Sequence, residues 1–319
     1  MKLAKRHKPS ATRRLLVILS AFVALIVIAT GCSSSSSDSG SSSAGYPVTV
    51  TSGSGTVTLN AEPKSIVSLS PTATEMLYAI GAGDQVKATD SYSNYPEEAK
   101  AKMTSLSGLQ PNVEAITQYQ PDLVVMSSDS GSVDTIVTQL KALNVPVWVG
   151  PAATSLDDVY AQITQLGELT NHKKQADDVV SKMKKDIAAA YKDVKAPANS
   201  TYYYELDPTY YSVTSNTFIG AALAPFGLTN IADGSASGSD YPQLNAESII
   251  KANPSMILLA DTICCDVNAA AVSARPGWNE IAAVKNNKIV PLNDDIASRW
   301  GPRIVELIQQ VAAQVKGLK

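Results

Sequence analysis

The order of hydrophobic and polar positions predicts alternating strands and helices in the first half of the globular part of the chain. Short apolar runs bounded by turn residues are typical of buried strands, and apolar residues that recur every three or four positions are typical of helices. The predicted strands are 65–69, 86–89, 123–126 and 147–149, and the predicted helices are 72–80, 112–118 and 133–143. A hairpin at 46–59 precedes them. This alternation predicts an α/β domain with a largely parallel sheet.

A longer helical pattern follows. Apolar residues recur at three- and four-residue steps from Ala176 to Val194, lysines and aspartates fill the opposite face, and Pro197 ends the pattern. A helix of about 24 residues spans roughly 36 Å, which is long enough to cross a domain. We therefore expect two α/β halves connected by one helix: an N-terminal lobe at 46–170, the connecting helix at 171–196 and a C-terminal lobe at 197–319.

Part of the first half recurs in the second half at a constant offset of 133 residues. The pattern Asn-x-Glu-x-Ile, followed by a proline and three apolar residues, occurs at 112–125 and again at 245–258. Each copy predicts a helix, a turn at the proline and a buried strand. The recurrence indicates either two similarly built lobes, which the shared register favours, or a capping pattern that is common at helix starts.

The first 31 residues have the pattern of an export signal. Six basic residues and no acidic ones lie in this segment, and the apolar run 15–29 contains only Ser20 as a polar residue. The run is shorter than the roughly 20 apolar residues that span a membrane. It leads into Ala29-Thr30-Gly31-Cys32, which resembles the lipobox of bacterial lipoproteins, apart from Ala29, where that pattern prefers Leu, Val or Ile. An uncleaved anchor and an ordinary secretory cleavage site are the alternatives.

In the lipobox interpretation Cys32 becomes the acylated, palmitate-bearing first residue of the mature chain. The serine- and glycine-rich segment 32–45 contains one charge, Asp38, and predicts a flexible tether. We therefore expect a protein anchored by lipid to the outer face of the cell membrane. Arg13-Arg14 is a partial match to a twin-arginine export signal.

Removing the export signal changes the charge of the protein. The whole chain of 319 residues has a net charge of -3, but the part after residue 31 has 20 basic and 29 acidic residues, a net charge of -9. An acidic body gives no electrostatic reason to expect a nucleic-acid partner.

The chain lacks the residue clusters that catalysis or a resident metal needs. Its only histidines are His7 and His172, so neither a multi-histidine metal site nor a Ser-His-Asp triad is expected, and phosphate-loop and dinucleotide fingerprints are absent. We therefore expect no enzyme, no catalytic residues and no cofactor. The rival is an exported hydrolase in which Glu75 or Asp207 acts as the acid or base.

Tyrosine supplies 13 of the 19 aromatic residues, and many of these tyrosines lie next to predicted strand ends. Binding crevices of α/β folds open at the carboxyl ends of their strands. A tyrosine or tryptophan offers an apolar face and a polar tip, so the pattern favours a large amphipathic ligand. The aromatic residues in question are Tyr92, Tyr95, Tyr202, Tyr203, Tyr204, Tyr210, Tyr211, Tyr241 and Trp300.

Several motifs over about residues 46–319 resemble the cobalamin/iron-siderophore class of periplasmic binding proteins. They are Ser65–Glu75, Tyr92-Ser-Asn-Tyr-Pro96, Asn112-Val-Glu114, Gln120–Val125, Arg275-Pro-Gly-Trp278 and Arg299-Trp-Gly-Pro-Arg303. The resemblance implies two Rossmann-like lobes joined by one long helix, with the ligand in the cleft between them. It also implies an ABC importer, made of a permease and its ATPase, as the partner. The binding protein itself would be a monomer.

The resemblance assigns residues to two roles. Glu114 and Glu247, the two glutamates of the internal repeat, would dock on arginines of the permease. A carboxylate in the first turn of a helix also has a structural explanation, because the helix dipole stabilises it there. Together with the pattern of aromatic residues near strand ends, the resemblance predicts ligand contacts at Tyr92, Ser127, Tyr204, Tyr210, Tyr241, Arg299 and Trp300.

The ligand is expected to be a metal chelate, and its identity stays open between a cobalamin-type corrinoid, a ferric siderophore and haem. Tyr92 and Tyr241 fall on aromatic positions of the cobalamin binders, whereas Gly108 and Ser127 occupy two further aromatic positions. Arg299 either pairs with a ligand carboxylate or is a structural element. A sensor that docks on a signalling protein is the alternative to an importer subunit.

Two adjacent cysteines, Cys264 and Cys265, are the only ones after Cys32. They exclude a disulfide scaffold. They either form a vicinal disulfide, a strained ring that stiffens a loop, or remain two thiols.

Overall fold

The computed structural model describes residues 45–235 and 238–318, and Cys32, the export signal and most of the tether lie outside this part. The described residues begin with the predicted hairpin, whose strands β1 (Val48–Ser52) and β2 (Gly55–Leu59) pair antiparallel. Val50, Val57 and Leu59 are buried in the core, whereas the threonines that alternate with them, Thr49, Thr51, Thr56 and Thr58, are exposed, as the period of two predicts.

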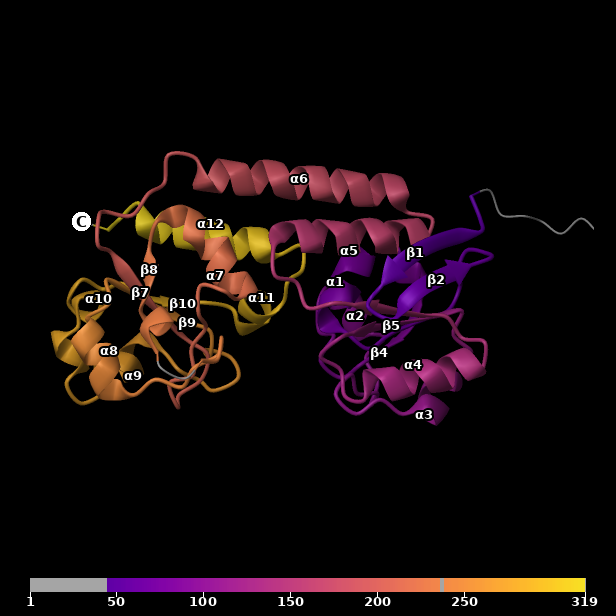
Figure 1. Cartoon of the computed structure of the whole chain (residues 1–319), viewed down its shortest axis with the longest axis horizontal. Helices are drawn as coiled ribbons and strands as arrows, with labels where there is room; N and C mark the ends of the chain where they lie inside the picture. Colours follow the sequence, from indigo (N-terminus) through magenta and orange to yellow (C-terminus); the bar gives the residue numbers. More distant parts are fainter. Residues whose placement is uncertain (1–44, 236–237, 319) are drawn as a thin grey trace, which may run out of the picture. The chain divides into compact units, whose positions relative to one another are not determined.

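The N-terminal lobe is built on a four-stranded parallel sheet with the order β4-β3-β5-β6 (Figure 1). Its strands are β3 (Ile66–Ser68), β4 (Val86–Thr89), β5 (Leu123–Ser127) and β6 (Val147–Gly150). Every residue of β5 is buried. Leu123 and Val125 pack on one face of the sheet and Val124 and Met126 on the other, so helices cover both faces.

Helices α1 and α5 pack on one face of this sheet, and helices α3 and α4 pack on the other. Ser70 starts the first of them: its side chain accepts a hydrogen bond from the backbone N–H of Ala73, and Pro71 occupies the first turn. The helices are α1 (Pro71–Ala79), α2 (Glu97–Lys100), α3 (Val113–Thr117), α4 (Val133–Ala142) and α5 (Leu156–Leu169), with the short 3₁₀ turn η1 (Gly83–Gln85).

One long helix, α6 (Lys173–Tyr191), connects the two lobes. It packs against α5 of the N-terminal lobe and against α12 (Ile304–Val315) of the C-terminal lobe (Figure 1). The helix has 19 residues and is shorter than the stretch of about 24 residues that the apolar period predicts. Its C-terminal end comes earlier because Asp193 adopts a left-handed backbone conformation (φ 57°).

The C-terminal lobe repeats the architecture with a parallel sheet in the order β10-β9-β7-β8. The strands are β7 (Thr201–Glu205), β8 (Thr229–Asn230), β9 (Met256–Leu259) and β10 (Ile289–Pro291). The remaining helices are α7 (Phe218–Leu223), α8 (Ala246–Ala252), α9 (Ala269–Ser273), α10 (Ala282–Lys285) and α11 (Asp294–Ser298), with the 3₁₀ turns η2 (Ala224–Phe226), η3 (Ile231–Gly234) and η4 (Trp278–Glu280). The predicted fold class, two α/β lobes joined by one helix, is confirmed.

The internal repeat corresponds to the same structural unit in each lobe. Helix α3 is followed by strand β5, and helix α8 is followed by strand β9. Asn112 and Asn245 are the N-cap residues of these helices, and each side chain accepts a hydrogen bond from a backbone N–H of the first turn. Similarly built lobes and helix capping therefore both explain the repeat. None of the described helices is long and apolar enough to cross a membrane.

Candidate ligand-binding site

A cavity of about 450 Å³ lies where the two lobes meet. The N-terminal lobe lines it with segments that follow the carboxyl ends of β3, β4 and β5, where parallel α/β sheets place their binding residues. The C-terminal lobe contributes the end of α11 and the residues directly after it. The lining residues are Leu69, Ser70, Pro71, Thr72, Asp90, Tyr92, Gly108, Leu109, Ser127, Asp129, Ser130, Asp295, Ser298, Arg299 and Trp300.

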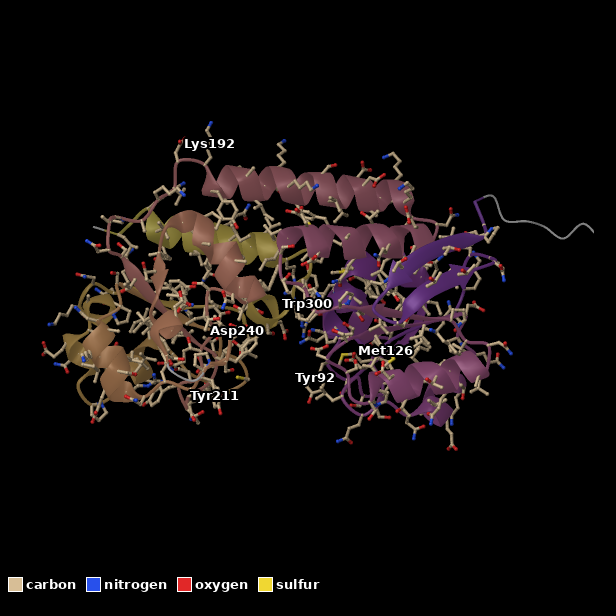
Figure 2. The ribbon with its side chains drawn as sticks, viewed as in Figure 1. Tyr92, Met126, Lys192, Tyr211, Asp240 and Trp300 are labelled. Atoms are coloured by element: carbon tan, nitrogen blue, oxygen red, sulfur yellow. The ribbon has the colours of Figure 1, made fainter. Side chains whose placement is uncertain are left out.

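Four of the seven residues predicted to bind ligand line this cavity. They are Tyr92, Ser127, Arg299 and Trp300. Figure 2 shows Tyr92 and Trp300 at the border between the lobes. The Tyr92 side chain is open to solvent, with 61% of the residue exposed, so its ring is available to a ligand. The cavity therefore combines aromatic surfaces from both lobes.

Tyr204 was predicted to contact ligand, and this prediction is wrong. The residue lies inside strand β7 and is fully buried, together with its neighbours Tyr202 and Tyr203. Its hydroxyl donates a hydrogen bond to the backbone carbonyl of Ala297 (3.1 Å). Helices cover both faces of this strand, so its side chains have no route to the cleft.

Tyr210 and Tyr241 do not line the cavity either. The ring of Tyr210 stacks on Trp278, with 5.9 Å between the ring centroids, and lies under the guanidinium of Arg275. Tyr241 is on the surface, with 57% of the residue exposed. The structure thus places Tyr210 in the packing of the C-terminal lobe and leaves Tyr241 outside the cavity.

Arg299 lines the cavity, but its guanidinium is already hydrogen-bonded to other residues of the protein. Nη1 donates to Glu75 (2.9 Å) and to the side-chain oxygen of Asn94 (2.9 Å). Nη2 donates to Asp295 (2.7 Å) and to the backbone carbonyl of Tyr92 (3.1 Å). All four Nη hydrogens are engaged in this way. The geometry therefore favours the structural role for this arginine over pairing with a ligand carboxylate.

The network around Arg299 joins the lobes. Glu75, in α1 of the N-terminal lobe, is buried and also accepts hydrogen bonds from Nε (2.8 Å) and Nη2 (2.5 Å) of Arg303. The Arg303 guanidinium in turn lies 3.9 Å from the centre of the Tyr95 ring. Asn94 donates to Asp295 across the same boundary (2.9 Å). We call Glu75, Asn94, Asp295, Arg299 and Arg303 the inter-lobe network.

This pairing also argues against the hydrolase alternative. The Glu75 carboxylate is held between two arginines, so it has no free position from which to take a proton from water. Asp207, the other candidate, accepts hydrogen bonds from the backbone N–H and the hydroxyl of Thr209. Among the described residues no group of three or more His, Cys, Asp or Glu side chains could hold a metal ion.

Three carboxylates in the cavity were not predicted from the sequence: Asp90, Asp129 and Asp295. Asp90 follows β4 directly and Asp129 lies two residues after β5, so position at a strand carboxyl end is the signal that could have found these two. Burial raises the pKa of Asp90, although hydrogen bonds from Tyr92 and Ser93 oppose the shift. Ser127 adds a buried hydroxyl that has no hydrogen-bond partner within the described structure.

The C-terminal lobe holds a second buried polar cluster, away from the cavity lining. Arg275 makes two hydrogen bonds to the carboxylate of Glu205 (2.6 and 2.7 Å), and its guanidinium lies over Trp278. Asp261, which follows β9, is fully buried. Burial and the neighbouring Glu205 raise the pKa of Asp261 to about 7. The Arg-Pro-Gly-Trp motif therefore serves packing inside this lobe.

Glu114 and Glu247 are both exposed, in the first turn of α3 and of α8 respectively. Neither makes an ion pair within the described part of the chain. Their positions on equivalent helices of the two lobes leave both carboxylates open to a partner.

Cys264 and Cys265 are exposed free thiols, so the structure contains the second of the two predicted alternatives and no disulfide ring. Asp294 holds their loop, because its carboxylate accepts hydrogen bonds from the backbone N–H groups of Ile263 (2.9 Å) and Cys264 (2.7 Å). Burial and the hydrogen bond to Cys265 raise the pKa of the Cys264 thiol to about 12.

Comparison with known proteins agrees with this architecture. The ABC transporter substrate-binding lipoprotein YvrC of Bacillus subtilis (strain 168), described as uncharacterised, is 35% identical over 278 residues, which cover 85% of this chain and 86% of the relative. A cobalamin-binding protein of Halobacterium salinarum is 32% identical over 277 residues, covering 84% of this chain and 73% of the relative.

A solved structure shows the same fold. The crystal structure of a possible iron-binding (periplasmic solute-binding) protein from Staphylococcus epidermidis is 26% identical, with a TM-score of 0.68, and the match covers 80% of this chain and 99% of that one. The family model described as periplasmic binding protein matches residues 66–296. The chain belongs to the periplasmic binding protein family, whose members are substrate-binding proteins of ABC transporters and not enzymes.

Proposed function

We propose that this protein captures a cobalamin-type corrinoid in the cavity between its lobes and delivers it to an ABC permease. The observation that carries the proposal is the cavity itself, because both lobes line it and each presents an aromatic side chain, Tyr92 or Trp300. A corrinoid is large and amphipathic, with apolar faces and amide-bearing edges, and it suits a site of aromatic and polar groups. The 32% identity to a cobalamin-binding protein supports the same ligand.

Delivery requires a docking surface, and we assign it to Glu114 and Glu247. Both carboxylates are exposed at equivalent helix starts of the two lobes. A carboxylate so placed can receive an arginine in a charge-assisted, two-point hydrogen bond. One glutamate on each lobe would let a single permease dimer hold both lobes together.

Anchoring completes the proposal. Acylation of Cys32 would hold the protein at the outer face of the membrane through the segment 32–45. A tether of this kind raises the effective concentration of the binding protein at its permease.

The binding step is tested by titrating the purified protein with cyanocobalamin while following tryptophan and tyrosine fluorescence, with calorimetry as the second readout. Saturable one-to-one binding is expected, and its absence would overturn the choice of ligand.

The docking step is tested in cells with the double variant Glu114→Arg/Glu247→Arg. We expect corrinoid uptake to be lost while ligand affinity and unfolding midpoint are unchanged, because both side chains lie on the surface and outside the cavity. The matched control replaces two other exposed acidic residues by arginine, Asp157→Arg and Asp178→Arg. Normal uptake by the folded, ligand-binding double variant would refute the docking assignment.

A ferric siderophore is the second candidate. The similar Staphylococcus epidermidis structure is described as a possible iron-binding protein, and a ferric chelate could use the same cavity. Titration with ferrichrome under the same conditions separates the two ligands.

A further inference from the structure

The charges that line the cavity are unbalanced. Among the lining residues that the structure describes, three are acidic, Asp90, Asp129 and Asp295, and Arg299 is the one cation. The arginine is already neutralised, because it is paired with Glu75 and Asp295. Glu75 and Asp295 together balance Arg299 and Arg303, so the inter-lobe network as a whole carries no net charge. Asp90 and Asp129 make no ion pair with a described residue.

Asp129 is the most accessible of these carboxylates. It is exposed, and it makes no hydrogen bond or ion pair with any described residue. Asp90 is buried in the wall of the same cavity, where it accepts hydrogen bonds from the Tyr92 backbone N–H (2.7 Å) and the Ser93 hydroxyl (3.3 Å). Neither carboxylate can be satisfied by a lysine or arginine of the cavity, since the single lining cation is committed elsewhere.

Charges of one sign in a cleft with walls of low dielectric constant produce a strong electrostatic potential inside the cleft. Such a cleft attracts ligands of opposite charge and repels ligands of like charge. An anionic ligand would also need donors to replace its water shell. The side-chain donors of the cavity wall that are not already committed are neutral hydroxyls, among them the buried hydroxyl of Ser127 and the hydroxyl of the exposed Tyr92.

We propose that the cavity accepts neutral or cationic metal chelates and rejects anionic ones. The unpaired carboxylates would accept hydrogen bonds from amide N–H groups at the edge of the ligand, and the Ser127 hydroxyl would donate to an amide carbonyl. A neutral corrinoid or a ferric hydroxamate meets this condition. Haem, with its two propionates, and ferric catecholates do not. The inference rests on the proposed function, because it concerns the same cavity.

The test compares two ligands that differ in one side-chain group and in charge, and the salt dependence isolates the contribution of the charge. Cyanocobalamin is neutral, and its monocarboxylic acid derivative carries a carboxylate in place of one side-chain amide. We expect the derivative to bind the wild-type protein at least tenfold more weakly in 20 mM salt. The difference should shrink at 0.5 M salt, where screening is nearly complete beyond a few ångströms. Ferrichrome against ferric enterobactin gives the same comparison among iron chelates.

Matched variants separate the local charge from the overall charge. Asp129→Asn should bring the affinity for the monocarboxylate to within about threefold of the variant's own affinity for cyanocobalamin, so the ratio of the two affinities is the readout. Asp178→Asn changes the net charge equally, but on helix α6 and outside the cavity, and should change neither affinity. If the monocarboxylate or haem binds as tightly as cyanocobalamin, the charge rule fails while the proposed function stands. If none of these chelates binds, both fail.

Discussion

Replacing Glu75 by glutamine removes the one negative charge that two arginines of the opposite lobe share. The carboxylate is 3% exposed and accepts three charge-assisted hydrogen bonds, one from Arg299 and two from Arg303. Glutamine has nearly the same shape, but it has one acceptor oxygen in place of two. Its amide N–H groups would face the N–H groups of the arginines, and two donors cannot form a hydrogen bond. Arg299 would then keep Asp295 as an ion-pair partner, whereas Arg303 would lose the one ion pair that it makes with a described residue.

The expected cost follows from this burial. Removing one member of a buried ion pair typically costs about 3–5 kcal/mol, because the remaining charge is left without compensation. Arg299 keeps three other acceptors, and Arg303 keeps its contact with the Tyr95 ring, so we expect the lower end, about 3 kcal/mol of unfolding free energy.

The assay is equilibrium unfolding in urea, followed by tryptophan fluorescence and by circular dichroism at neutral pH. The control is Asp186→Asn, which removes a pair with Lys182 on exposed helix α6 and should cost at most about 0.5 kcal/mol. If Glu75→Gln loses no more stability than the control, the network does not stabilise the protein and the reasoning is refuted. Non-coincident transitions by the two probes would show that the lobes unfold separately in the variant.

Two further predictions concern titration and ligand contact. Asp261 has a pKa of about 7 in the folded protein against about 4 for an unfolded aspartate, so the folded state favours the protonated form and stability falls as pH rises from 4 through 7. Asp261→Asn mimics the protonated form, so the excess of its urea midpoint over that of wild type should grow between pH 5 and pH 8. The same pH dependence of the midpoint in both proteins would contradict this. Tyr92→Ala should weaken cyanocobalamin binding by about tenfold in titration, because a ring lining the cavity is removed. Tyr211→Ala, at an exposed position outside the cavity, is its control, and an equal loss in both variants would exclude a specific contact.

The fold was predictable because its signals are local. Strands covered on both faces need continuous apolar runs, and residues 123–126 and Met256–Leu259 are such runs. Each is preceded by a capped helix and a proline turn, so the internal repeat marks equivalent units of the two lobes. The long helix was overestimated because Val194 is buried although it lies beyond the helix end, which extends the apolar period into a turn.

The site was only partly predictable because its decisive contacts are distant in the sequence. Glu75 and Arg299 are 224 residues apart, and no local pattern shows that they meet. The error at Tyr204 has a different cause. The three adjacent tyrosines of β7 suggest an aromatic binding surface at a strand end, but they lie inside the strand, and helices cover both of its faces. Tyr204 is therefore a core residue, and its hydroxyl is paired to the backbone carbonyl of Ala297.

The contacts that join the two lobes also form the cavity. Arg299 lines the cavity while it holds Glu75 of the other lobe, and its Nη2 fixes the backbone carbonyl of Tyr92, whose side chain also lines the cavity. A wide opening of the lobes would break these buried hydrogen bonds and the packing of α6 on both lobes. A site kept in place this way loses little conformational entropy when a ligand binds. The inter-lobe network therefore acts on affinity through preorganisation, and Glu75→Gln should weaken corrinoid binding even though Glu75 does not line the cavity.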